Sequence, residues 1–408
     1  MDAQNNILRS AWQSHPGKAV LGILWLLAAI IGGLGIAERL AYGDRLSDLS
    51  SYVPWGLWVA AYIYFIGLSA GAFLLSSLVY VFGMHKLEPI AKLALFVAAV
   101  TLAMALMSIS FDLGHMERFY YVFLRPQFHS MMAWMVWLYT GYFLLLLGEL
   151  FFALRRDLVK LSASQIAADN RTLRVLGALG IPLAIAFDGG VGADFGTVLA
   201  REYWHSALYP LIFLSGALLS GGALMTVIVA IFWPRRDEAW RDLLRFLGRI
   251  VLALVLLDVL LEWAEYSIPA WYRIGPEYKL ITYVLFGPYW YVFWIFHMLL
   301  GVVVPIYLLL RHRNPLGIGL AAGLVAVTFL AVRLDLVIPG LITPELRGLQ
   351  SSYSDPIGHR LTFQYLPTFF EWQVLIGVVA IGIAIFYLGL RFLPLTRPLP
   401  SQSIEVTR

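Results

Sequence analysis

Cysteine is absent from this sequence of 408 residues, and charged residues make up only 13% of it. Without thiols the chain can form no disulfide, ligate no iron–sulfur cluster through thiolates and use no cysteine nucleophile. Any such cluster would belong to a partner. Soluble domains carry about 25% charged residues, so the low charge and the long apolar runs predict a protein that crosses a membrane several times.

Familiar cofactor motifs are also missing. The sequence has no phosphate-binding loop and no His-Glu-x-x-His metal motif. Only one of the eight histidines, His297, falls near the centre of an apolar run, so a haem held by two histidines is not expected. We therefore expect no haem or metal in this chain. The polar N-terminal residues, with no cleavage motif after the first apolar run, also argue against a cleavable signal peptide.

Apolar runs long enough to cross a bilayer as helices recur along the chain. They predict an all-α polytopic membrane protein, a single integral domain over residues 1–408 with ten transmembrane helices. The fifth run is the weakest, because Pro182 and nearby glycines disfavour a helix. Helices 2–5 (about 54–188) and 6–9 (about 205–338) would form two four-helix bundles, with helices 1 and 10 peripheral. The ten runs are 19–41, 54–83, 89–111, 130–154, 172–188, 205–233, 246–268, 282–310, 315–338 and 367–392.

The distribution of basic residues predicts the orientation. If the N-terminus is cytoplasmic, most of the 29 Lys and Arg residues fall on the cytoplasmic side, as the positive-inside rule requires. Both termini are then cytoplasmic in an inner (cytoplasmic) membrane, and most acidic residues lie on the periplasmic side. The outer segments, where we expect the functional loops, are 42–53, 112–129, 189–204, 269–281 and 339–366.

Ionisable side chains gather at the predicted outer ends of the helices. They suit a quinol headgroup, whose two hydroxyls must each pass a proton to a carboxylate or imidazole. Asp112 and His115 would share a face if their helix continued, so we predict them as the catalytic pair. The alternative is that these charges are merely solvated at the interface. The remaining outer ionisable groups are Asp188, Glu262, Glu265, Arg333 and Asp335.

Other residues on the same side complete the predicted quinone site. His129 begins the fourth run, and Trp58 and Tyr62 lie near the start of the second. A phenol about two turns below the surface, as at Tyr62, needs a hydrogen-bond partner. The alternative for these aromatic residues is an interfacial belt. In the second run, Gly67 and Gly71 form a Gly-x-x-x-Gly pair that predicts close helix packing.

Three ionisable residues lie within apolar runs and away from the predicted outer ends of the helices: Glu149, Asp258 and His297. A charge inside the membrane is costly, so such residues usually face the protein interior and serve a function. Together with Glu262 and Arg333 they are candidates for a proton path. The alternative is a structural clasp of neutral, hydrogen-bonded acids.

Several short motifs, taken in order, resemble the NrfD/PsrC family of membrane subunits. The resemblance covers nearly the whole chain and is greatest for its ten-helix members, the DsrP and HybB types. The region Phe187-Asp188-Gly189-Gly190 departs from the His-Gln-Ser segment of hydrogenase-type members. The motifs are Pro54-Trp55-Gly56-Leu57-Trp58, Ser110-Phe111-Asp112-Leu113-Gly114, Tyr365-Leu366-Pro367-Thr368 with Glu371, and Arg391-Phe392-Leu393-Pro394.

The resemblance implies a function in electron transport. Members are quinone-reactive subunits that use menaquinone or ubiquinone near the outer face and bind no metal. It implies a periplasmic ferredoxin-like iron–sulfur partner, further membrane and cytochrome subunits and, for DsrP types, sulfur metabolism. Proton translocation, expected from the buried ionisable residues, would be an added role. By motif match, Asp112 is the site residue that carries over most directly.

A second class of function stays open from the residues alone. Asp258, His297 and Glu149 could be the carrier path of a secondary transporter or ion translocator. Transporters often contain paired helices broken at the midplane. No such paired break is evident in the sequence, which favours the quinone-reactive subunit.

Overall fold

A computed structural model describes residues 16–344, 346, 348–349 and 362–396, and within these ranges it contains helices and no strand. Nine of the described helices are long and apolar enough to cross a membrane. They are α2 (Pro16–Tyr42), α3 (Leu57–Tyr80), α4 (Ala91–Asp112, preceded by the short η1, His85–Ile90), α6 (Met131–Leu158), α7 (Ala163–Gly196), α8 (Tyr209–Phe232), η3–α11 (Val292–Val303 and Val304–Arg311), α12 (Pro315–Ile342) and α14 (Phe369–Phe392). The predicted cytoplasmic termini and much of the predicted loop 339–366 lie outside the described residues.

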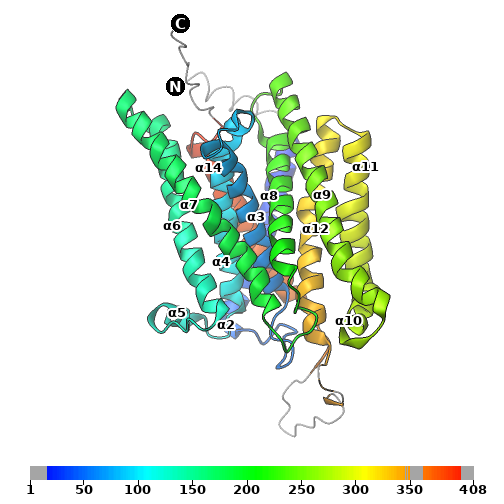
Figure 1. The fold of residues 1–408 in the computed structure, drawn as a ribbon. Helices are drawn as coiled ribbons and strands as arrows, with labels where there is room; N and C mark the ends of the chain where they lie inside the picture. Colours follow the sequence, from blue (N-terminus) through cyan, green and yellow to red (C-terminus); the bar gives the residue numbers. More distant parts are fainter. Residues whose placement is uncertain (1–15, 345, 347, 350–361, 397–408) are drawn as a thin grey trace.

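The predicted seventh span corresponds to α9 (Glu238–Tyr272), which is not among these nine. Its apolar part carries Asp258, Glu262 and Glu265, and these charges lower its mean hydropathy. Figure 1 nevertheless shows α9 running alongside α8 and α12 through the depth of the helix bundle. The all-α membrane architecture is thus confirmed, while the count of ten spans stays a prediction.

Two predicted helices differ from those observed. The run 172–188 is part of the much longer α7, which continues through Pro182 to Gly196. The run 282–310 is not one helix: α10 (Gly275–Phe286) ends before Gly287, and a π-helical segment, η3, starts at Val292. A Cβ atom at Gly287 would lie 2.2 Å from the Tyr283 carbonyl oxygen, so only glycine fits at this break. In Figure 1, α10 lies across the end of the bundle.

The centre of the molecule is α3, which is buried along most of its length and contacts α4, α7, α8 and α12. Its approach to α8 is close. A Cβ atom at Gly71 would lie 2.0 Å from the Ala217 carbonyl oxygen, and one at Gly221 would lie 2.7 Å from the Gly71 Cα. The Gly67-x-x-x-Gly71 pair therefore lies on a packing face, as predicted.

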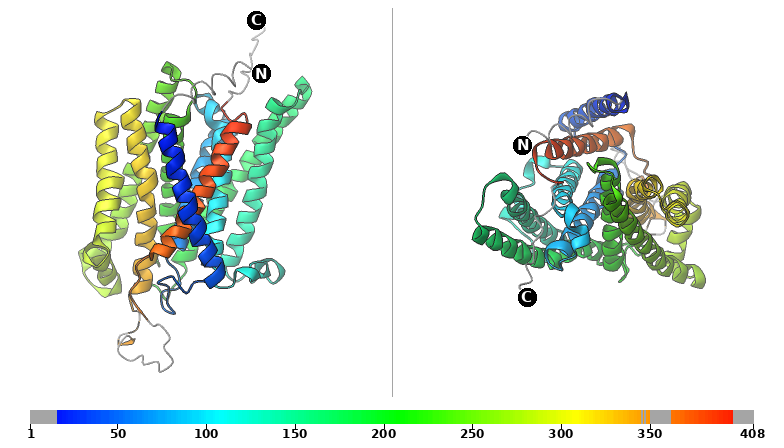
Figure 2. Two further views of the ribbon diagram at one scale, coloured as in Figure 1. Left: turned by 180° about the vertical axis from the view of Figure 1, so that it is seen from behind. Right: turned by 90° about the horizontal axis from the view of Figure 1, so that it is seen from above.

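Helices α2 and α14 pack against each other along one side of the molecule (Figure 2). A Cβ atom at Gly32 would lie 2.2 Å from the Gly377 Cα, so the two backbones nearly touch. Trp25 anchors the pair by donating a hydrogen bond to the Ala380 carbonyl at 3.0 Å. Most of the large apolar side chains on the outer face of α2 are exposed, as expected for a face against lipid.

Successive spans run up and down, so one set of connections lies at each end of the molecule. We call the end that carries the short helix α5 (Tyr121–Leu124) and α10 the α10 end (Figure 1). There α4, α7, α9 and α12 finish, and α3, α6, α8 and α14 begin. The topology thus gathers the predicted outer acids in one half of the molecule.

Candidate functional site

Five side chains from separate segments meet at the α10 end around the C-terminus of α4. We call them the Asp112 cluster: Arg39, Trp58, Asp112, Tyr365 and Glu371. Arg39 donates from Nε to the Phe111 carbonyl and from Nη2 to the Leu113 carbonyl, both at 2.8 Å. It thereby satisfies carbonyls that the end of a helix leaves free. Asp112 Oδ1 is buried, and no described residue gives it a hydrogen bond.

Tyr365 joins the last span to the second. Its hydroxyl accepts a hydrogen bond from the Leu57 amide at 2.7 Å and donates to Glu371 Oε1 at 2.8 Å. Burial raises the pKa of Tyr365 well above its usual range, so the hydroxyl stays protonated and can donate. A Cβ atom at Gly56 would lie 2.1 Å from this hydroxyl, which explains the glycine.

The indole of Trp58 closes the same cluster. Its Nε1 donates to the Glu371 carbonyl at 3.1 Å, and the Arg39 guanidinium lies 5.5 Å from its ring centre. Three motifs that carry the family resemblance, 54–58, 110–114 and 365–371, therefore meet at one place. Arg39 is not among the predicted site residues, although an arginine in the last turn of an apolar helix is a signal for such a role.

The predicted pairing of Asp112 with His115 is wrong. It required the helix to continue, but α4 ends at Asp112 and Leu113 adopts an extended conformation. The His115 side chain is 67% exposed, and its Nδ1 lies 3.0 Å from Glu117 Oε1. His129 is also exposed, in the turn before α6.

Tyr62 has the hydrogen-bond partner that its depth required. Its hydroxyl bonds to that of Tyr139 on α6, and the two rings meet edge to face. The Tyr139 ring also contacts Phe187, the neighbour of Asp188 on α7. Tyr62 lies one turn after Trp58 on α3, so these side chains connect the Asp112 cluster toward the interior.

A second group of ionisable residues lies deeper, between α8, α9, η3 and α12. We call it the buried ion cluster: Ser215, Asp258, Glu262, His297 and Arg333. His297 Nε2 lies 3.0 Å from Glu262 Oε2, and Ser215 donates to Asp258 Oδ1 at 3.0 Å. Ser215 was missed, because a serine in an apolar helix is usually bonded to its own backbone.

Arg333 is the cation at the centre of this group, with 1% of its surface exposed. Its guanidinium lies 4.3 Å from the Phe213 ring centre and 5.0 Å from that of Phe329. Within the described chain, Nε and Nη2 have no hydrogen-bond partner. Its charged neighbours are Asp188, Asp258 and Glu262.

Asp188 faces this cluster from α7. It is 1% exposed, and neither carboxylate oxygen receives a hydrogen bond from a residue that the structure describes. At 1.5 Å per residue, Asp188, Glu262 and Arg333 lie about 12–15 Å inside their helix ends, at similar depth. The structure thus brings together four of the five residues of the predicted proton path.

The fifth, Glu149, lies apart on α6. It is completely buried, and its two carboxylate oxygens have no hydrogen-bond partner among the described residues. Its neighbour across the helix interface is Gly177 of α7, where a Cβ atom would lie 3.9 Å from Oε1. The Tyr142 ring packs against that of Phe187, with ring centres 4.4 Å apart. Tyr142 therefore lies between Glu149 and Asp188, and both carboxylates interact with it electrostatically.

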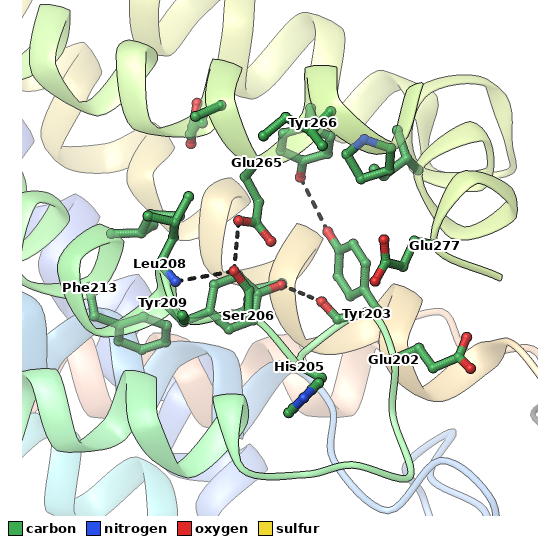
Figure 3. A pocket seen from close by; sticks show the side chains of 18 of the residues that line it. Glu202, Tyr203, His205, Ser206, Leu208, Tyr209, Phe213, Glu265, Tyr266 and Glu277 are labelled. Carbon is green, nitrogen blue, oxygen red and sulfur yellow. Dashed lines mark hydrogen bonds between the residues drawn. The ribbon is translucent and has the colours of Figure 1, made fainter. Parts of the chain in front are cut away.

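A cavity of about 300 Å³ opens beside the buried ion cluster (Figure 3). Its walls come from the loop 197–208 and from α8, α9, α10 and α12, and Glu262 and Arg333 contribute to its lining. Ser206 donates to Glu265 Oε2 at 2.8 Å, and the hydroxyls of Tyr203 and Tyr266 lie 3.2 Å apart. The residues that line this cavity begin at Glu202, whereas the predicted quinone-site residues lie on the earlier spans, between residues 54 and 188.

No group of three or more His, Asp or Glu side chains is placed to hold a metal ion within the described ranges. The ionisable groups are instead paired or isolated in apolar surroundings.

The helices and the buried ionisable groups together define a multi-span integral membrane protein. The family described as "Polysulphide reductase, NrfD" matches residues 46–345, so the chain belongs to the NrfD family. The resemblance seen in the sequence is confirmed.

Named relatives align along nearly their whole length. A selenate reductase subunit of Mesobacillus selenatarsenatis is 36% identical, covering 90% of this chain and 92% of its own. The "Hdr-like menaquinol oxidoreductase integral membrane subunit" of Archaeoglobus fulgidus is 29% identical over 94% of each chain. The "Menaquinone reductase, integral membrane subunit" of Nitratidesulfovibrio vulgaris is 24% identical, covering 89% of this chain and 88% of its own.

Proposed function

We propose that this chain is the quinone-reactive membrane subunit of a multisubunit redox complex. It exchanges electrons between the membrane quinone pool and an iron–sulfur subunit docked at the α10 end. The names of two relatives include menaquinol or menaquinone, which supports menaquinone over ubiquinone as the substrate. The observation that carries the proposal is the Asp112 cluster, where distant segments of the chain bury a carboxylate oxygen that no described residue satisfies.

The residues of this cluster fit a quinol headgroup. A free buried carboxylate oxygen is suited to accept the proton of a headgroup hydroxyl as electrons leave the ring. Trp58 provides an apolar wall, and Arg39 fixes the backbone on both sides of Asp112. Tyr62 and Asp188 extend the polar surface inward. His115 and His129 are not part of the proposal, because both side chains are exposed to solvent.

The wider arrangement follows from the same proposal. Counting α9 gives ten spans, in two bundles of four with α2 and α14 outside them. The basic loops at the opposite end support the proposal that the α10 end lies on the periplasmic side of the inner membrane. We propose the buried ion cluster, with Glu149, as a proton path, and place the complex, with its cytochrome and further membrane subunits, in sulfur metabolism.

The test is Asp112→Asn in the assembled complex. Removing a positioned proton acceptor should lower quinol-linked electron transfer by about 10²-fold or more. Glu117→Gln, at the same end but exposed, is the matched control and should retain full activity. Assembly is checked by copurification of the partner subunits. Full turnover by an assembled Asp112→Asn complex would contradict the proposed site.

A secondary transporter remains the competing function, and the buried ion cluster is the observation that favours it. A transporter would move ions as an isolated chain, without quinone or partner. Flux measurements on the purified subunit in sealed vesicles separate the two functions. If the chain is a quinone-reactive subunit, we expect no ion flux through the isolated chain under these conditions.

A further inference from the structure

The cavity beside the buried ion cluster has a charged floor. Glu262 and Arg333 line it, and both are more than nine-tenths buried. Two guanidinium nitrogens of Arg333 have no partner in the described structure. A volume of about 300 Å³ exceeds what one water molecule needs, and polar groups at the floor can hold ordered water there. The floor therefore joins the cluster to a space that can be hydrated.

The mouth of the cavity is acidic. Glu202, Glu265 and Glu277 line it toward the α10 end, and one oxygen of Glu202 is buried without a partner among the described residues. Figure 3 shows the Glu265 carboxylate between Ser206 and Tyr266, with Ser206 fixing one oxygen. Burial raises the pKa of Tyr203, so this neighbour is a neutral donor and does not compete for protons. Such a mouth attracts positive charge and repels anions.

From the floor and the mouth together, we infer that this cavity is a proton outlet that connects the buried ion cluster to the α10 end. The species that passes through it is the proton, carried by water, and Glu265 is the carboxylate that receives the proton from the cavity. The inference rests on the proposed proton path, because protons must reach the buried ion cluster before they can leave it through the cavity.

The transfer steps balance. Protonated Glu262 gives its proton to cavity water, and the resulting carboxylate takes a proton from His297 across their 3.0 Å contact. Glu265 takes the proton from cavity water and releases it to water at the α10 end. One proton enters at His297 and one leaves for each passage, and both carboxylates return to their initial state. The N–H groups of Arg333 hold water at the floor.

The first test uses the absence of cysteine, since a single introduced thiol is then the only one in this chain. Ala264→Cys places it in the cavity lining, Ala223→Cys at a fully buried position of α8, and Leu199→Cys on the exposed loop. Vesicles containing the complex are treated from the α10 side with a charged, membrane-impermeant thiol reagent, and modification of this chain is measured by mass spectrometry. We expect modification at positions 264 and 199 but not at 223.

Two results of this labelling would overturn the outlet. One is an unmodified Ala264→Cys beside a fully modified Leu199→Cys, which would mean that the cavity is dry. The other is protection of Ala264→Cys by added menaquinone, which would make the cavity a headgroup site.

The second test measures protons released per electron by the complex in sealed vesicles. Quinol oxidation itself releases one proton per electron, so the outlet is measured by the protons released above that value. Glu265→Gln should lower this excess at least fivefold, whereas Glu265→Asp, which keeps a carboxylate, should retain most of it. A wild-type ratio in Glu265→Gln would refute the outlet and leave the proposed function intact. A wild-type complex that releases no more than this one proton per electron would contradict both the proton path and the outlet, but not quinone exchange.

Discussion

Tyr365→Phe removes one oxygen atom and should cost more than one hydrogen bond. The hydroxyl accepts from the Leu57 amide and donates to Glu371 Oε1, and all three groups are buried or nearly so. Phenylalanine leaves a buried amide and a carboxylate oxygen without their partner. Each such loss costs about 1–3 kcal/mol, so we expect the free energy of unfolding to fall by about 2–6 kcal/mol.

The matched control is Tyr64→Phe, which loses a single bond. Among the residues that the structure describes, the Tyr64 hydroxyl bonds to the Ala326 carbonyl alone, at 2.7 Å, and it lies outside both clusters. We expect it to cost about 1 kcal/mol. Both variants are compared with wild type by titration with SDS in mixed micelles, using the fluorescence of the 14 tryptophans as the signal of unfolding.

The two variants should also differ in electron transfer. Because Glu371 and Trp58 border Asp112, loosening them should reduce quinol-linked electron transfer in Tyr365→Phe but not in Tyr64→Phe. If the two variants lose equal stability and equal activity, Tyr365 does not organise the cluster, and the reasoning from its two bonds is refuted.

Two further substitutions test the packing and the buried ion pair. Gly71→Ala should destabilise the fold by about 1–3 kcal/mol, because its Cβ would meet the Ala217 carbonyl oxygen. The control Gly222→Ala, with no heavy atom within 4 Å of the new Cβ, should be tolerated. Equal losses of stability in the SDS titration would contradict this prediction. Glu262→Gln and His297→Leu should each lower the free energy of unfolding by about 3–5 kcal/mol, because each leaves the other buried group without its partner. The double variant should lose less than the sum of the two. Strictly additive losses would show that the two side chains do not interact.

The positions of most helices could be predicted from the apolar runs. In a bilayer every backbone polar group must be satisfied within the segment, so a long apolar run has few alternatives to a helix. The same rule explains why α7 continues past Asp188. An acid ends the apolar run in the sequence, but in the fold it lies in the protein interior and the helix goes on to Gly196.

The breaks were harder to predict, although signals were present. Gly287-Pro288 marks a turn, yet apolar content alone carried the predicted helix through it. Gly114 likewise follows the end of α4, and reading it as a helix stop would have separated His115 from Asp112. Both errors came from extending a helix past a glycine.

The candidate residues could be recognised one by one, but not their partners. An ionisable residue within an apolar run is visible in the sequence, as Glu262 and His297 were. Which pairs meet depends on the rotation and depth of helices that are far apart in the chain. Tyr365 reaches Leu57 across 308 positions, and no local pattern encodes such a contact.

The contact between the first and last described spans has a consequence for biogenesis. Trp25 and its acceptor Ala380 are 355 positions apart. At roughly 5–20 residues per second, a ribosome needs roughly 20–70 s to synthesise the chain between them. Throughout that time α2 has no α14 to bind, and its glycine-containing face must be covered by lipid or by an insertion factor. Loss of the last span would therefore leave an early intermediate that membrane proteases could recognise.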